Sequence, residues 1–131
     1  LNLVTTYGLT DFVSRAAAEA LENDYGVKVI ADIYNGRRTL FLDAVAGLND
    51  IVVRGSEGGM YVMLDVSAIE PDDEKFAWAL LDEEKVGVMP GSSFGEAAKG
   101  HISISLCQPD NVLMDAAGRL RRFASSYRKA A

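Results

Sequence analysis

Alternating apolar and polar side chains predict a β-strand over residues 101–107. Its apolar face consists of Ile102, Ile104 and Leu106, and its opposite face of His101, Ser103, Ser105 and Cys107. Residues 60–66 are apolar at nearly every position, which predicts a central strand covered on both faces. Asp65 is the polar exception, and a buried carboxylate at this position needs hydrogen-bond partners.

Two shorter apolar runs predict further strands at residues 51–54 and 86–89. Residues 55–59, between the first run and the central strand, contain three glycines and predict a turn. Pro90 follows the second run and has no N–H for a ladder hydrogen bond. This strand therefore cannot continue as a central strand of the sheet.

Four other stretches have apolar residues at helical spacing. These stretches are residues 10–25, 27–46, 71–84 and 110–127. Thr10 and the pair Asp110-Asn111 stand where a side chain can cap the first turn of a helix. The apolar stripe of the second stretch is Ile30, Ile33, Tyr34, Phe41, Ala44, Val45 and Leu48. The buried stripe of the third is Phe76, Ala77, Leu80 and Leu81, and Trp78 lies off it.

The predicted elements follow one another in the order α-α-β-β-α-β-β-α. This order predicts an α+β fold, with a three- to four-stranded antiparallel or mixed sheet and helices packed mainly on one side. The chain has 131 residues, the size of one domain, and about half of them are apolar. We therefore expect a single domain with its own hydrophobic core over residues 1–131.

Charge and composition exclude several classes of function. The net charge is −6 with acidic and basic residues intermixed, which argues against nucleic acid and against an anionic membrane surface as partners. Cys107 is the only cysteine and His101 the only histidine, so we expect no disulfide and no metal site. A single cysteine fits a reduced, cytoplasmic setting, and no apolar run is long enough to span a membrane.

Standard catalytic motifs are missing from the sequence. The glycines do not have the spacing of a dinucleotide-binding or phosphate-binding loop. His101 has no evident aspartate partner, and Ser92-Ser93 lacks the context of a nucleophilic serine. We therefore assign no catalytic residue to this chain.

One stretch does resemble a known family. The loop PGSSFG at residues 90–95, followed by a glycine and an alternating strand, resembles the small C-terminal domain of the pyridoxal-phosphate aminotransferases of class I/II. These enzymes have the aspartate aminotransferase fold, fold type I. The segments GGMYVMLDVS at residues 58–67 and SLCQPD at residues 105–110 are most similar to the arginine:pyruvate aminotransferase branch.

The resemblance implies that the chain is part of a larger enzyme. Residues 1–48 would lead from the large domain, and residues 49–131 would form the sheet and helices of the small domain. The parent enzyme would be a cytoplasmic homodimer that transfers an amino group from an amino acid, such as arginine, to a 2-oxo acid. Its pyridoxal phosphate binds a lysine of the large domain, and no lysine here lies in a matching motif. The chain alone should therefore be inactive and bind no cofactor.

The resemblance also implies two substrate-binding positions, Phe94 and Ser103. Family members have an arginine that binds the substrate α-carboxylate at the position of Ser103. Serine has no charge and cannot replace a bidentate guanidinium. Phe94 either forms a wall of the substrate pocket or packs into the core. Glu96, in the same loop, either meets the guanidinium of an arginine donor or is solvated.

Two alternatives remain open. The replacement of the arginine by Ser103 favours a non-catalytic, degenerate aminotransferase-like domain that acts as a binding or regulatory module. The second alternative is a structural partner subunit, which exposed apolar area on the helix at residues 10–25 would support.

Overall fold

The computed structural model describes residues 8, 10–23, 26–48, 50–54 and 56–127. The helices are α2 (Asp11–Glu22), α3 (Val27–Val45), α4 (Asp73–Glu84) and α5 (Asp110–Ser126). The strands are β1 (Val52–Arg54), β2 (Tyr61–Asp65), β3 (Met89–Pro90) and β4 (His101–Ser105), and the two short 3-10 helices are η1 (Gly91–Phe94) and η2 (Glu96–Ala98). The predicted order of helices and strands is confirmed. The chain forms two compact units, residues 1–32 and 33–131.

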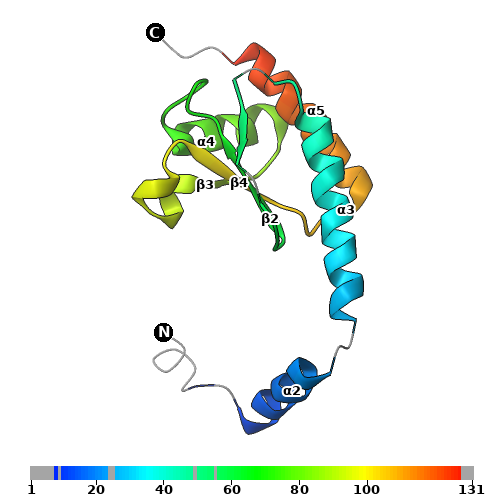
Figure 1. Cartoon of the computed structure of the whole chain (residues 1–131). Coiled ribbons are helices and arrows are strands. Elements are labelled where there is room, and N and C mark those ends of the chain that lie inside the picture. Colours follow the sequence, from blue (N-terminus) through cyan, green and yellow to red (C-terminus); the bar gives the residue numbers. More distant parts are fainter. Residues whose placement is uncertain (1–7, 9, 24–25, 49, 55, 128–131) are drawn as a thin grey trace. The chain divides into compact units, whose positions relative to one another are not determined.

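The strands form one antiparallel sheet in the order β1-β2-β4-β3 (Figure 1). This arrangement confirms the predicted α+β fold. Pro90 lies in the edge strand β3, as its missing N–H requires. The predicted strand at residues 86–89 is largely wrong, since β3 begins only at Met89. Val86 and Val88 are apolar because they pack against the core, not because they pair in the sheet.

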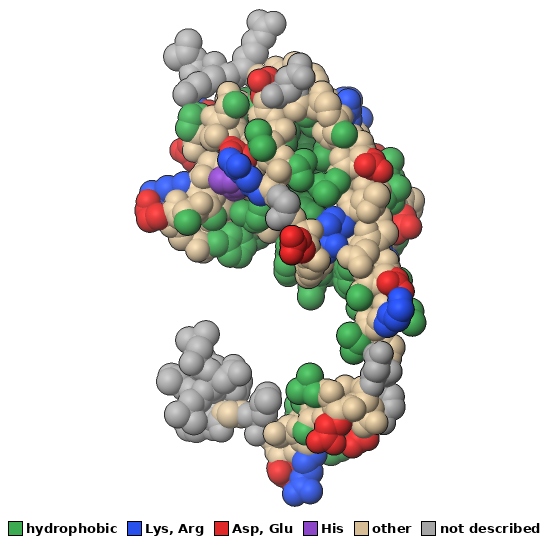
Figure 2. Space-filling model, viewed as in Figure 1, with side chains coloured by type: hydrophobic (Ala, Val, Ile, Leu, Met, Phe, Trp, Pro, Cys, Tyr) green, Lys and Arg blue, Asp and Glu red, His purple; other side chains and the backbone are tan. Residues whose placement is uncertain are grey.

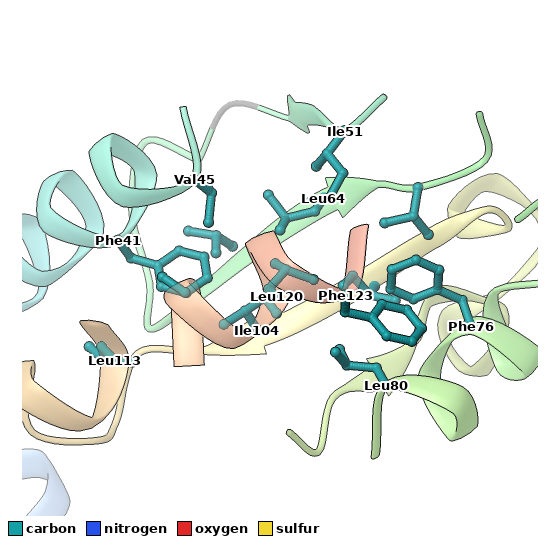
Figure 3. Packing of buried hydrophobic residues seen from close by; sticks show 14 of the residues in the cluster. Phe41, Val45, Ile51, Leu64, Phe76, Leu80, Ile104, Leu113, Leu120 and Phe123 are labelled. Carbon is teal, nitrogen blue, oxygen red and sulfur yellow. The ribbon is translucent and has the colours of Figure 1, made fainter. Parts of the chain in front are cut away.

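The core lies on one face of the sheet, where α3, α4 and α5 contribute side chains (Figure 3). The alternation predicted for β4 is confirmed, because Ile102, Ile104 and Leu106 are all buried. The rings of Phe76 from α4 and Phe123 from α5 meet edge to face, with centroids 5.2 Å apart. Edge-to-face contact is a favoured geometry for aromatic pairs, so this pair joins the two helices at the centre of the core.

Helix α4 follows its sequence pattern closely. The Asp72 carboxylate caps it by accepting the backbone N–H of Lys75 at 3.0 Å. Phe76, Ala77 and Leu80 are buried, and Trp78 is 60% exposed. Leu81 was expected in the buried stripe but is 37% exposed, because it lies at the edge of that face.

The predicted N-cap position of the first helix is confirmed, and that of the last helix is wrong. Thr10 occupies the N-cap position of α2, but its side chain makes no capping hydrogen bond. The N-cap of α5 is Pro109, and Asp110 is already the first helical residue. The Asp110 carboxylate instead accepts a hydrogen bond from Arg37 Nε at 3.2 Å.

Helix α3 departs from its predicted stripe. Phe41 and Val45 are buried as expected, whereas Ile30 and Ile33 are 55% and 48% exposed. Arg38 is buried in their place, because its Nη2 reaches the carbonyl oxygen of Gly59 at 2.6 Å. A charged residue on the helix therefore ties it to the turn before β2.

Candidate functional site

The outer face of the sheet is open, contrary to the prediction for residues 60–66. Val62 and Leu64 of β2 are buried on the core face, but Tyr61 on the opposite face is 54% exposed. Within residues 33–131, α3, α4 and α5 contribute side chains to the core face, and the opposite face of β2 carries the exposed Tyr61 and the half-buried Met63. A strand that is apolar on both faces thus has one face available for binding.

A groove of about 920 Å³ lies on this outer face. It is lined by Tyr61, Met63, Gly87, Val88, Met89, Phe94, Ser103 and Ser105. None of these lining residues carries a charge, and most of them are apolar. The groove therefore suits an uncharged or apolar part of a ligand, with the serine hydroxyls as polar contacts.

Ser103 lies in the floor of the groove. It pairs with Met63 of β2 on one side and with Met89 of β3 on the other. It is only 7% exposed, so its environment is the two neighbouring strands and the groove. Sequence reasoning named Ser103 but missed Tyr61, Met63 and Met89. The register of the sheet brings these residues to the groove. Once the pairing of β4 with β2 and β3 is known, alternation along the strands indicates which side chains share the face of Ser103.

Phe94 lies in η1 and is 63% exposed. The alternative that it packs into the core is thus wrong. The structure brings Phe94 and Ser103 together in the lining of one groove, although they are on different elements. Glu96, two residues further on, forms an ion pair with Lys99 at 2.8 Å and lies outside the groove lining.

A second polar cluster surrounds Asp65 at the end of β2. Its carboxylate accepts hydrogen bonds from the Ser67 hydroxyl at 2.6 Å, the Ser67 N–H at 3.1 Å and Arg54 Nη2 at 2.6 Å. These bonds, the Ser67 hydroxyl above all, lower the pKa of Asp65 to about 2. The need for partners predicted for Asp65 is therefore met.

His101 lies beside this cluster, with Nε2 3.9 Å from an Asp65 oxygen and Nδ1 2.9 Å from the Lys99 carbonyl oxygen. Figure 2 shows the histidine in purple beside side chains of both charges. The Ser67 hydroxyl donates to Asp65, so it is not activated by the histidine. Serine, histidine and aspartate meet here without forming a catalytic relay.

The lysines of the described chain do not form a site for pyridoxal phosphate. Lys28, Lys75 and Lys99 pair with nearby carboxylates, and Lys85 donates to the carbonyl oxygen of Asp82. None of the four lines the groove, and Lys129 lies outside the described residues. The residues present thus do not fit the cofactor. Within the same part of the chain, no cluster of three His, Cys, Asp or Glu residues could hold a metal ion.

Comparison with known proteins identifies the family. The family model for aminotransferase class I and II matches residues 2–120. The chain belongs to this family. The resemblance of the PGSSFG loop is therefore confirmed.

Two curated relatives show the extent of the similarity. The arginine–pyruvate transaminase of Pseudomonas aeruginosa is 32% identical over 121 residues, which cover 92% of this chain and 31% of the relative. The aspartate/prephenate aminotransferase of Thermus thermophilus is 38% identical over 113 residues, 83% of this chain and 28% of that enzyme. The chain thus spans about a third of the length of the curated relatives it matches.

Solved structures agree in fold. An aromatic aminotransferase from Pyrococcus horikoshii has a TM-score of 0.80 at 25% identity, covering 94% of this chain and 34% of the other. A tetra mutant of the Thermus thermophilus aspartate aminotransferase has a TM-score of 0.77 at 31% identity, covering 92% and 33%. The predicted likeness to aspartate aminotransferase-type folds is therefore confirmed. None of the described helices combines the length and apolar character that a membrane crossing requires.

Proposed function

We propose that this chain is the small C-terminal domain of a pyridoxal-phosphate aminotransferase. The observation that carries the proposal is the uncharged groove between the PGSSFG loop and strands β2 and β4, in a chain of the aminotransferase class I and II family. Residues 1–48 lead from the large domain, and residues 49–131 form the small domain. The large domain supplies the lysine and the phosphate site that the described residues lack.

In this proposal the groove faces the substrates of the intact enzyme. An amino group passes from an amino acid to a 2-oxo acid, and the small domain closes over the substrate to position it and exclude water. Phe94 forms a wall of the pocket, and Ser103 forms its floor. The chain alone binds no cofactor and is inactive.

Exposed apolar side chains support a partner domain, and on the first helix they support the alternative of a structural partner subunit as well. Phe12 and Leu21 of α2 are 81% and 89% exposed, and Ile30 of α3 is 55% exposed. None of the residues of α2 is buried, and exposed apolar side chains of this size are candidates for a contact surface. We propose that they pack against the rest of the parent enzyme, which is a cytoplasmic homodimer.

The amino donor is proposed to be arginine, on the basis of the identity to the arginine–pyruvate transaminase. The donor's guanidinium would compete with Lys99 for Glu96, because these two side chains are already paired. The neutral groove is suited to the aliphatic part of such a donor.

The second candidate is a non-catalytic binding or regulatory module. Ser103 favours it, because the groove lining offers no cation to a substrate carboxylate. The two candidates differ in whether the domain supports turnover when it is joined to a functional large domain.

A chimera tests both candidates. The part of the Thermus thermophilus aspartate/prephenate aminotransferase that matches this chain is replaced by residues 1–131, and transamination is measured with arginine and with aspartate as donor. The aminotransferase proposal expects turnover that exceeds that of the large domain alone. A folded, cofactor-loaded chimera that stays inactive even with Ser103→Arg would contradict the aminotransferase proposal and favour the binding module.

A further inference from the structure

One buried carboxylate holds both ends of the loop at residues 91–100. Asp73 lies in the first turn of α4 and is 3% exposed. Its Oδ1 accepts the Ser92 hydroxyl at 2.6 Å. Its Oδ2 accepts the backbone N–H of Ser92 at 3.2 Å and that of Gly100 at 2.7 Å. Ser92 is near the start of the loop and Gly100 is its last residue.

Asp73 is not needed to cap its own helix. The neighbouring Asp72 is the N-cap residue and accepts the N–H of Lys75. A buried carboxylate is costly unless hydrogen bonds compensate for its lost hydration, and here three donors from the loop do so. The contacts of Asp73 therefore serve the loop, which is 19 to 27 residues away in the sequence.

The loop between these contacts is tightly closed. A Cβ atom at Gly91 would lie 1.9 Å from the carbonyl oxygen of Ala98, so only glycine fits there. Gly100 has φ +76°, which also favours glycine. Within the loop, the Gly95 N–H bonds to the Ser92 carbonyl and the Ala98 N–H to that of Gly95. Loop and carboxylate thus form one connected unit.

Phe94 is the loop residue that lines the groove, and it lies between the two contact points of Asp73. We propose that Asp73 is a positioning residue that holds the loop so that Phe94 stays in the wall of the groove. The role in substrate binding rests on the proposed function above. The effect on the loop does not, because it needs neither substrate nor cofactor.

The test compares Asp73→Asn with Asp72→Ala in the full chain. The asparagine is neutral and has one acceptor oxygen, whereas three donors point at this position. Hydrogen exchange is followed at the Gly100 amide and, as a reference in the sheet, at Leu106, whose N–H bonds to the Met60 carbonyl. We expect Asp73→Asn to accelerate exchange at Gly100 at least tenfold more than at Leu106. Asp72→Ala weakens the start of the same helix and should change both amides alike.

A second readout follows the wall of the groove itself. Met89 lines the groove together with Phe94, so we expect the NMR shift of its methyl group to report on the aromatic ring. Phe94→Leu defines the shift without the ring. We expect Asp73→Asn to move the Met89 methyl at least halfway to that position, and Asp72→Ala to leave it in place.

Ser92→Ala is a milder variant that keeps the proposal testable if Asp73→Asn does not fold. It removes only the hydroxyl bond to Asp73, and we expect a smaller change in the same direction for both readouts. Equal acceleration at Gly100 and Leu106 would overturn the proposal, as would an unmoved Met89 methyl in Asp73→Asn. An inactive chimera, by contrast, would contradict only the proposed aminotransferase function and not the role of Asp73 in holding the loop.

Discussion

Ser103 on β4 pairs with Met63 on β2, and both residues line the groove on the outer face of the sheet. The pairing places a serine between the apolar side chains of Met63 and Met89, at the position that we propose to correspond to the carboxylate-binding arginine of the family. The groove lining offers no cation as a substitute. The nearby Arg54 is engaged with Asp65 at 2.6 Å. Ser103 therefore leaves the lining of the groove without a charged side chain.

Restoring a cation at this position should strengthen the binding of substrate carboxylates. In the chimera, we expect Ser103→Arg to lower the apparent KM of an amino acid donor by roughly tenfold to a hundredfold, the effect of a charged hydrogen bond of ~1.5–3 kcal/mol. Steady-state transamination measures it. Ser103→Asp should weaken binding through charge repulsion, and a donor with an amidated carboxylate should show no gain. Equal kinetics for the three proteins would mean that β4 does not face the substrate.

Phe94 and Phe76 should differ sharply in their effect on stability. Phe76 is fully buried, and Phe76→Ala should cost about 3–5 kcal/mol of unfolding free energy. Phe94 is 63% exposed, and Phe94→Ala should change stability by no more than about 0.5 kcal/mol. Urea denaturation of the full chain measures both. A large loss for Phe94→Ala would indicate that its role is in packing rather than in the groove.

Two glycines should respond in opposite ways to an added methyl group. Gly36 lies within α3, and a Cβ atom there would meet nothing within 4 Å. Gly36→Ala should therefore stabilise the chain by about 0.5–1 kcal/mol. Gly91→Ala should destabilise it by about 1–3 kcal/mol, because the Ala98 carbonyl oxygen occupies the space. The urea midpoints of the two variants measure these effects. A shift in the same direction for both would contradict the open surroundings of Gly36 or the crowded surroundings of Gly91.

The carboxylate of Asp65 should make stability depend on pH in the acid range. Its pKa falls from an ordinary value of 3.8 to about 2 on folding. A depressed pKa stabilises the fold above the unfolded value, so this stabilisation is present above about pH 4 and is lost as the pH falls towards 2. Asp65→Asn should cost roughly 1 kcal/mol at pH 7.

Urea midpoints at pH 7, 4 and 2.5 check this prediction. Wild type should lose more stability than Asp65→Asn between the two lower pH values. Asp115→Asn is a suitable control. The ion pair of Asp115 with Arg119 is exposed, and such pairs contribute little to the free energy of unfolding. Parallel pH profiles for wild type and Asp65→Asn would show that the Ser67 and Arg54 contacts do not stabilise the charged carboxylate.

Local periodicity was enough to predict most elements. The alternation of Ile102, Ile104 and Leu106 indicated which face of β4 is buried, because successive side chains on a strand point to opposite faces. Helical spacing likewise placed Phe76 inside and Trp78 outside. The PGSSFG loop indicated the family, and it also pointed to Phe94 and Ser103, which the fold brings into one groove.

Tertiary structure alone decided where Arg38 and Asp73 find their distant partners. Arg38 is buried because its guanidinium donates a hydrogen bond to the carbonyl oxygen of Gly59, 21 residues away. Helical periodicity cannot predict such a contact. Asp73 is one of three consecutive acidic residues at the start of α4, yet its partners are Ser92 and Gly100 in a distant loop. The open face of β2 has the same origin. The apolar sequence of β2 indicates that both of its faces suit apolar contacts. Only the packing of the helices determines which face joins the core and which face is available to a ligand or a second domain.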